Sequence, residues 1–207
     1  MQVNKKDFIE IEFTGRTKEG EIFDSNIEKD LKKAELNIPV RPLVICVGER
    51  MFLESVDDFL IGKEIGKEYE ITLTPEKAFG IRDSKLVKMI PIKAFLDQNL
   101  NPRQGMMLNI DGAIAKIISV SSGRTLVDFN NPLAGKTIEY EIKIIRKVED
   151  PDEKAKALVL FFSRQEFPFK IIENKTLEIK IPEGFDKFFE LFKDKFKDLL
   201  NLDLKFE

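Results

Sequence analysis

The chain has 207 residues, of which 43% are hydrophobic and 34% are charged, and its formal net charge is −3. This composition is typical of a globular protein, and the dispersed, slightly acidic charge argues against a nucleic-acid partner. No apolar run approaches the ~20 residues of a membrane span, and the polar start predicts no signal peptide. We therefore expect a cytoplasmic protein that does not bind a membrane.

The absence of histidine excludes several kinds of chemistry. Imidazole is the usual metal ligand and the usual proton shuttle near neutral pH, and this chain has none. The sequence also lacks the glycine-rich phosphate loops of nucleotide-binding proteins. We therefore expect that any catalysis proceeds without a metal, a cofactor or a proton relay. The single cysteine, Cys46, lies in an apolar run and predicts a buried, unreactive thiol.

The first elements read as strands. The stretch DFIEIEFTG alternates with a period of two, which places Ile9, Ile11 and Phe13 on one face. A turn leads to GEIFDS, a second strand that ends near Asp24. Residues 27–42 are charged and contain two prolines, which indicates a loop or a bulged edge strand.

The period then changes to that of a helix. Apolar side chains recur every three to four residues from Phe52 to Leu60, and Gly62 follows as a stop signal. The next stretch, KEYEITLTP, alternates as a strand. Phe79 comes after that strand has ended and directly before a glycine, where the chain should lie near the surface. This ring is either a plug for the core or one wall of a pocket.

Residues 84–127 have the pattern of a separate small unit. They contain four short strand candidates, a hairpin signal at Asp111-Gly112 and a helical turn started by Pro91. Strong alternation resumes in IEYEIKIIRKVE, as expected if a small domain is inserted in a loop of a larger one.

The last part begins at a polar, proline-marked boundary at residues 150–154. A hairpin is expected near Asn174-Lys175, and GFDKFFELFKDKFKDLLN is expected to form a helix with a phenylalanine stripe. This stripe indicates a tightly filled core, a dimer face or a surface for apolar clients, and the pattern alone leaves the three open.

Five of these pieces together resemble the FKBP-type peptidyl-prolyl isomerases, in particular the SlyD-like branch and its long archaeal members. They follow one another at the spacing of that family across residues 5–149: DFIEIEFTG, GEIFDS, VGERMFLESVDDFLIGKEIGKE, TPEKAFG and DFNNPLAGKTIEYEI. The resemblance implies an α+β fold in which a twisted antiparallel sheet surrounds a short helix. It also implies three domains, namely an isomerase domain of residues 1–83 and 128–149, a small mainly-β insert-in-flap domain of residues 84–127, and a C-terminal α+β domain of residues 150–207.

The resemblance implies a mainly aromatic pocket that receives proline. Its residues in this chain would be Phe13, Phe23, Asp24, Leu43, Phe52, Leu53, Val56, Phe79 and Tyr140. In the family, the backbone N–H at the position of Leu53 binds a substrate carbonyl. The sequence pattern alone favours a different role for these residues: it places the aromatic side chains in the core and makes Asp24 a turn cap.

Three departures from the family matter. The family more often has tyrosine at the positions of Phe13 and Phe79, and the second of these commonly donates a hydrogen bond to the substrate. Val56 is a smaller pocket floor than the tryptophan of many relatives. The chain also lacks the histidine- and cysteine-rich tail of SlyD, so no nickel function is transferred.

The resemblance implies an isomerase that is also a folding chaperone. Its partners would be proline-containing peptides and unfolded or partly folded polypeptides, bound by apolar side chains of the insert: Met89, Ile90, Phe95, Met106, Met107 and Leu108. The alternative for these residues is a small core of the insert. Two rival functions are a holdase or binding module with a catalytically weak pocket, and a C-terminal adaptor for a specific partner. Residues 150–207 are also suited to pairing two copies into a homodimer.

Overall fold

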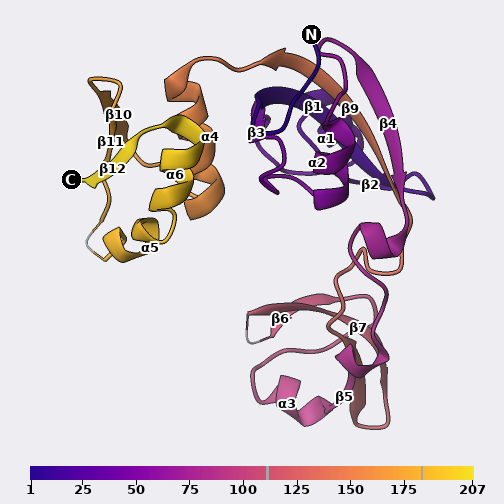
Figure 1. The fold of residues 1–207 in the computed structure, drawn as a ribbon. Helices are drawn as coiled ribbons and strands as arrows, with labels where there is room; N and C mark the ends of the chain where they lie inside the picture. The colour runs from indigo at the N-terminus through magenta and orange to yellow at the C-terminus, as the bar shows by residue number, and fades with distance from the viewer. Residues whose placement is uncertain (111, 183) are drawn as a thin grey trace. The chain divides into compact units, whose positions relative to one another are not determined.

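The computed structural model describes residues 1–110, 112–182 and 184–207 and has an α+β fold (Figure 1). The strands are β1 (Phe8–Thr17), β2 (Ile22–Ser25), β3 (Leu43–Cys46), β4 (Glu68–Leu73), β5 (Val87–Pro91), β6 (Met107–Ile110), β7 (Ala113–Ser121), β8 (Arg124–Asp128), β9 (Ile138–Lys147), β10 (Phe169–Ile172), β11 (Thr176–Ile179) and β12 (Asp203–Phe206). The helices are α1 (Glu28–Lys33), α2 (Glu54–Leu60), α3 (Ile92–Leu96), α4 (Pro151–Ser163), α5 (Asp186–Glu190) and α6 (Lys193–Leu200), with single 3₁₀ turns at Pro75–Lys77 and Ser84–Leu86.

The chain divides into two compact units. One contains Met1–Arg16, Gly20–Ile71 and Glu139–Glu207, and the other contains Thr17–Glu19 and Thr72–Ile138.

The main sheet belongs to the first unit and has the order β2-β1-β9-β4, with β3 also paired to β1. Its pairs of β1 with β2 and β3 are antiparallel, and Gly15 stands opposite Asp24. The expected alternation in β1 is confirmed, because Ile9, Ile11 and Phe13 are buried on one face while Glu12 is exposed.

Helix α2 confirms the helix expected from the sequence. Val56 and Leu60 are fully buried, which is the apolar face that the pattern predicts. The preceding turn is closed by Asp57, whose Oδ2 accepts a hydrogen bond from the Arg50 backbone N–H at 2.8 Å. Gly62 follows with φ of +79°, a conformation that favours glycine and ends the helix.

Residues 27–42, expected to form a loop or an edge strand, contain the short helix α1 instead. Its first turn contains the acidic residues Glu28 and Asp30, and its last turn contains the basic residues Lys32 and Lys33. This distribution of charge is favourable with the helix dipole. Leu31 is buried and fixes the helix to the rest of the unit. The two prolines that suggested a loop come after the helix has ended.

The second unit contains a four-stranded antiparallel sheet of order β5-β8-β7-β6. Helix α3 begins directly after Pro91, as the sequence predicts. The expected hairpin lies between β6 and β7, but Asp111 is outside the described residues. Buried Phe95, Ala115 and Val127 form the centre of a small core.

The last residues form helices and a three-stranded sheet of order β10-β11-β12, in which β11 and β12 are parallel. Helix α4 begins at the boundary expected from the sequence. The Asp150 side chain caps it by accepting a hydrogen bond from the Glu153 N–H at 2.9 Å, and Pro151 occupies the first turn. The single helix expected over residues 184–201 is two helices, α5 and α6.

One hydrophobic core joins the C-terminal elements to the outer face of the main sheet. Phe8 and Cys46 of the sheet pack in the same cluster as Leu158 of α4, Phe189 and Phe196. Phe192 stacks on Phe162 with ring centroids 4.2 Å apart. The phenylalanine stripe therefore supplies much of this core. Among the described residues, no helix is long and apolar enough to cross a membrane.

Candidate active site

Four aromatic rings from separate elements of the first unit converge. Phe13 lies on β1, Phe23 on β2, Phe52 just before α2 and Tyr140 on β9. The Phe13 and Phe52 ring centroids are 4.9 Å apart and nearly perpendicular. Tyr140 lies 5.4 Å from Phe52 and 5.7 Å from Phe23, also edge to face. These are favourable aromatic geometries, and they join side chains of four elements in one apolar cluster.

A glycine makes room for two of these rings. A Cβ atom on Gly15 would stand 2.6 Å from Phe23 Cζ and 2.8 Å from Tyr140 Cε1. The φ angle of Gly15 lies outside the left-handed region, so glycine is required here for space and not for backbone conformation. The absence of a side chain at this position is what permits Phe23 and Tyr140 to approach the strand so closely.

Val56, Leu53 and Leu43 lie on neighbouring parts of the same unit. Val56 is fully buried, and Leu43 is the first, half-buried residue of β3. Leu53 caps α2, and its carbonyl accepts hydrogen bonds from the N–H groups of Val56 at 2.8 Å and Asp57 at 2.9 Å. In the described part of the chain, the Leu53 N–H donates no hydrogen bond. A helix N-terminal N–H without a partner can bind a carbonyl oxygen.

Asp24 is the ionisable carboxyl group beside the cluster. Burial raises the pKa of Asp24, and a hydrogen bond from the Ser25 backbone opposes this shift. Burial, and next the charge of Asp24, raise the pKa of Tyr140. Both shifts report a poorly hydrated environment, in which neutral forms are favoured over charged ones.

Phe79 belongs to the other compact unit. It follows the 3₁₀ turn Pro75–Lys77 and is half-buried. The Gly80 N–H closes this turn with a hydrogen bond of 2.7 Å to the Pro75 carbonyl, and the Gly80 carbonyl accepts from the Gly135 N–H at 2.8 Å. The loop that carries Phe79 is thus held at both sides of its glycine.

The register of the insert sheet separates its apolar side chains into two faces. Ile90, Leu108 and Phe95 pack in the small core. Met89, Met107 and Ile114 instead lie on the opposite face, since Met107 pairs with Lys116, Asn109 with Ile114, and Met89 with Leu126. Met89 and Ile114 are each 60% exposed and Met107 is 46% exposed. Met106 is half-buried at the start of β6.

Ile114 was missed by the sequence reasoning, although a signal for it exists. In AIAKIISV, buried Ala115 and Ile117 alternate with Ile114 and Lys116, so the period of two places Ile114 on the outer face. Exposed Leu96, on α3, was missed as well, because a single apolar residue on a short helix has no distinguishing pattern.

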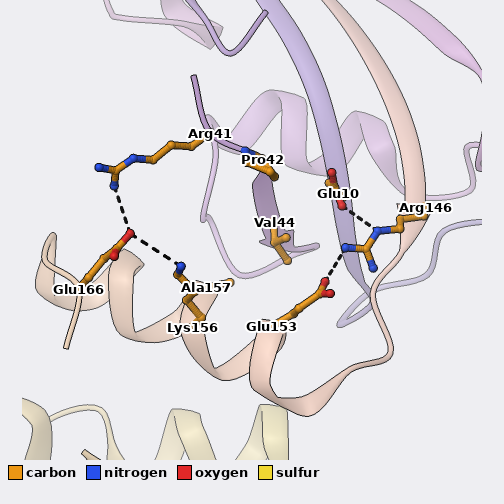
Figure 2. Close-up of a pocket in the computed structure, with 9 residues that line it drawn as sticks. All are labelled: Glu10, Arg41, Pro42, Val44, Arg146, Glu153, Lys156, Ala157 and Glu166. Carbon is orange, nitrogen blue, oxygen red and sulfur yellow. Dashed lines mark hydrogen bonds and ion pairs between the residues drawn. The ribbon is translucent and has the colours of Figure 1, made fainter. Parts of the chain in front are cut away.

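A concave region lies between the main sheet and α4 (Figure 2). Its volume is about 570 Å³. Arg146 bridges Glu10 at 2.7 Å and Glu153 at 2.5 Å, and Glu166 pairs with Arg41 and Lys156. All of its charged side chains are thus paired with one another, and Figure 2 shows Arg146 linking the strands to Glu153 of α4. We interpret this region as the polar rim of the shared core.

Among the described residues, no group of three or more His, Cys, Asp or Glu side chains is arranged to hold a metal ion.

Comparison with known proteins identifies the family. A family model described as FKBP-type peptidyl-prolyl cis-trans isomerase matches residues 1–99, and one described as FKBP26, IF domain matches residues 88–133. The chain is 33% identical over 145 residues to a short-type peptidyl-prolyl cis-trans isomerase of Methanocaldococcus jannaschii, in a match that covers 69% of this chain and 92% of that protein.

Two bacterial SlyD proteins are similar as well. The FKBP-type peptidyl-prolyl cis-trans isomerase SlyD of Aeromonas hydrophila is 28% identical over 146 residues, 70% of this chain and 64% of that protein. SlyD of Treponema pallidum is 28% identical over 165 residues, 78% of this chain and 86% of that protein. The chain therefore belongs to the FKBP-type peptidyl-prolyl cis-trans isomerase family. It is an isomerase of this type with an IF domain, so the resemblance in the sequence is confirmed.

Proposed function

We propose that the aromatic cluster is the proline-binding site of this isomerase. Phe13, Phe23, Phe52 and Tyr140 form its walls, and Asp24, Leu43, Leu53 and Val56 of the same unit complete it. The observation that carries the proposal is the convergence of four rings from four separate elements beside a backbone N–H, that of Leu53, with no partner in the described chain.

An apolar site can accelerate this reaction without a proton relay. Xaa-Pro bonds interconvert over tens to hundreds of seconds because the amide must lose its planar resonance. The planar amide is the more charge-separated form, so poorly hydrated surroundings disfavour it relative to the twisted form. Lowering the barrier by ~4 kcal/mol accelerates the reaction about a thousandfold. In this mechanism the Leu53 N–H holds a substrate carbonyl while the amide turns.

Exchange NMR on a short Xaa-Pro peptide tests the site. We expect Phe52→Leu and Phe13→Leu to lower the catalysed exchange rate at least severalfold. Phe59→Leu is the matched control, because Phe59 is half-buried and packs on Tyr69 and Lys63 rather than in the cluster. Equal rates for all three variants and the wild type would exclude these rings from the site.

We further propose that the insert binds unfolded or partly folded polypeptides. The observation that supports this is the apolar outer face of its sheet, where Met89, Met107 and Ile114 are exposed together. Exposed apolar side chains of this kind commonly mark interaction surfaces, and methionine adapts to varied partners. Ile90, Phe95 and Leu108 would support this face from the core, and Met106 would extend it.

A triple substitution separates binding from catalysis. Met89→Thr, Met107→Thr and Ile114→Thr together should abolish suppression of aggregation of a reduced, unfolded protein and leave isomerisation of a short peptide unchanged. The control carries Ile38→Thr, Val40→Thr and Ile61→Thr, which are exposed apolar residues of the first unit. Equal suppression by both triple variants would contradict the proposed surface.

We propose three domains: an isomerase domain of residues 1–83 and 128–149, an inserted domain of residues 84–127 and a C-terminal domain of residues 150–207.

We also propose that two copies of the chain pair through the C-terminal domain. Strand β12 lies at an edge of its sheet and Leu191 is exposed, and both features suit an interface. Sedimentation equilibrium at micromolar concentration tests the pairing, and a monomer would contradict it.

A further inference from the structure

Tyr140 carries the one hydroxyl group among the four clustered rings. The other three rings are phenylalanine. Only 4% of Tyr140 is exposed, so its phenol is nearly withdrawn from water. A buried hydroxyl normally finds a hydrogen-bond partner, because leaving it unpaired costs free energy.

The phenol end of this ring lies on the side of Asp24. The Cε1 atom, adjacent to the hydroxyl-bearing carbon, would be 2.8 Å from a Cβ on Gly15, and Gly15 stands opposite Asp24 in the β1–β2 pair. Burial, and next the charge of Asp24, raise the pKa of Tyr140, which agrees with this placement. The hydroxyl-bearing end of the ring therefore lies over the gap that the glycine leaves, on the strand pair that carries Asp24.

The hydroxyl nevertheless has no hydrogen-bond partner within the described chain. The fully sealed polar side-chain atoms without a partner in that part are Thr17 Oγ1, Asp57 Oδ1 and Thr125 Oγ1, so the Tyr140 hydroxyl keeps some access to the surface. Tyr69 is different, because its hydroxyl accepts from the Glu64 N–H at 2.8 Å and donates to the Glu64 carbonyl at 3.3 Å. Tyr140 thus presents an unused donor at the proposed proline site.

We propose that the Tyr140 hydroxyl donates a hydrogen bond to a carbonyl oxygen of the bound Xaa-Pro substrate. This inference rests on the proposed location of the site. A donor on the oxygen of the turning amide would favour its planar form, in which that oxygen is more negative, and would slow the reaction. The hydroxyl therefore binds a carbonyl next to the turning bond and holds the substrate while the amide twists.

Tyrosine NMR tests the contact directly, because the chain has only two tyrosines. The protein is labelled with ¹³C at the tyrosine Cζ position and titrated with a blocked Ala-Leu-Pro-Phe peptide. The Tyr140 resonance should shift on binding, because its hydroxyl gains an acceptor. The Tyr69 resonance, whose hydroxyl is already paired, should stay and serves as an internal reference. A saturated complex in which the Tyr140 resonance does not move would overturn the inference.

Kinetics with Tyr140→Phe give the second test. This variant should lower kcat/KM for the same peptide about tenfold, which corresponds to ~1.4 kcal/mol, while Tyr69→Phe leaves it unchanged. If the hydroxyl had only a structural role, Tyr140→Phe would lower the urea concentration at which the protein unfolds. We expect this concentration to stay at the wild-type value, because no hydrogen bond is lost on substitution. If the wild-type enzyme is active and Tyr140→Phe has the same kcat/KM, the proposed role of the hydroxyl is wrong, but the proposed site can stand. A wild-type protein that neither binds nor isomerises the peptide would overturn the proposed site as well.

Discussion

Gly15 and Tyr140 lie so close that a Cβ atom on Gly15 would stand 2.8 Å from Tyr140 Cε1, and Phe23 Cζ is nearer still at 2.6 Å. We therefore predict that Gly15→Ala forces these rings apart and destabilises the protein by about 1 to 3 kcal/mol, the usual range for overpacking. A urea titration measures this loss.

The control for Gly15→Ala is Gly20→Ala. Gly20 has φ of +88°, and no heavy atom lies within 4 Å of the point that a Cβ would occupy, so alanine there meets backbone strain without crowding. We expect the control to cost about 1 kcal/mol and to leave the peptide affinity of the protein intact. A Gly15→Ala variant with wild-type stability and affinity would contradict the packing described.

Asp24 gives a prediction about pH. Burial raises its folded-state pKa, so the folded protein holds this proton more tightly than the unfolded chain does. The free energy of unfolding therefore falls as pH rises from the ordinary carboxyl value of 3.8 through the raised pKa. We predict that Asp24→Asn is more stable than the wild type at neutral pH, and that the difference disappears below the ordinary value.

Asp7 is the matched control of opposite sign. Burial acts to raise its pKa, but the hydrogen bonds from Lys147 and Asn4 outweigh it and lower the pKa. Asp7→Asn should therefore be less stable than the wild type at neutral pH, and this deficit should shrink as pH falls through the lowered pKa. Urea titrations from about pH 3 to pH 7 compare the three proteins, and parallel pH profiles would contradict both assignments.

Arg146 joins the main sheet to α4 through Glu10 and Glu153. We predict that Arg146→Met lowers the free energy of unfolding by about 1 kcal/mol or less, because the paired groups are partly exposed and screened by water. The loss should shrink in about 1 M NaCl. Lys32→Met breaks the more exposed Lys32–Glu28 pair and should cost about 0.3 to 0.5 kcal/mol. An Arg146→Met deficit that is independent of salt would indicate lost packing instead.

Cys46 is fully buried, and burial, with the nearby acidic groups Glu49 and Asp57, raises the pKa of its thiol to about 12. Because the thiolate is the reactive form, we predict that the native thiol resists a thiol-specific reagent at about pH 8. The same reagent should modify it fully after denaturation in guanidinium chloride. Modification of the native protein at the rate of a free thiol would contradict this.

Much of the fold could be predicted because the main elements carry clear periods. The alternation that buries Ile9, Ile11 and Phe13 and the helical spacing that buries Val56 are both present in the sequence and confirmed. The proposed pocket residues followed from the resemblance alone, since an aromatic residue that faces a pocket has the same local pattern as one that faces a core. The glycine beneath Tyr140 was not identified, because its role depends on a residue far away along the chain.

Other features could not be predicted for physical reasons that differ between segments. Helix α1 has a single buried side chain, Leu31, which is too little apolar pattern to distinguish it from a charged loop. The break between α5 and α6 occurs without a proline or glycine, next to Phe192, which stacks on Phe162 of α4. Such a tertiary contact overrides the helical pattern and leaves no mark on it. Helix α4 did carry signals, namely Asp150 as cap and Pro151 in the first turn.

Phe8 and Cys46 of the main sheet share one hydrophobic cluster with Leu158, Phe189 and Phe196. The isomerase sheet and the C-terminal helices therefore share part of their hydrophobic core, and each loses packing without the other. A chain cut after residue 149 would leave one face of its sheet bare, so its behaviour would report misfolding as much as lost function. Mutations deep in the C-terminal helices can accordingly reduce isomerase activity in a cell by lowering the amount of folded enzyme.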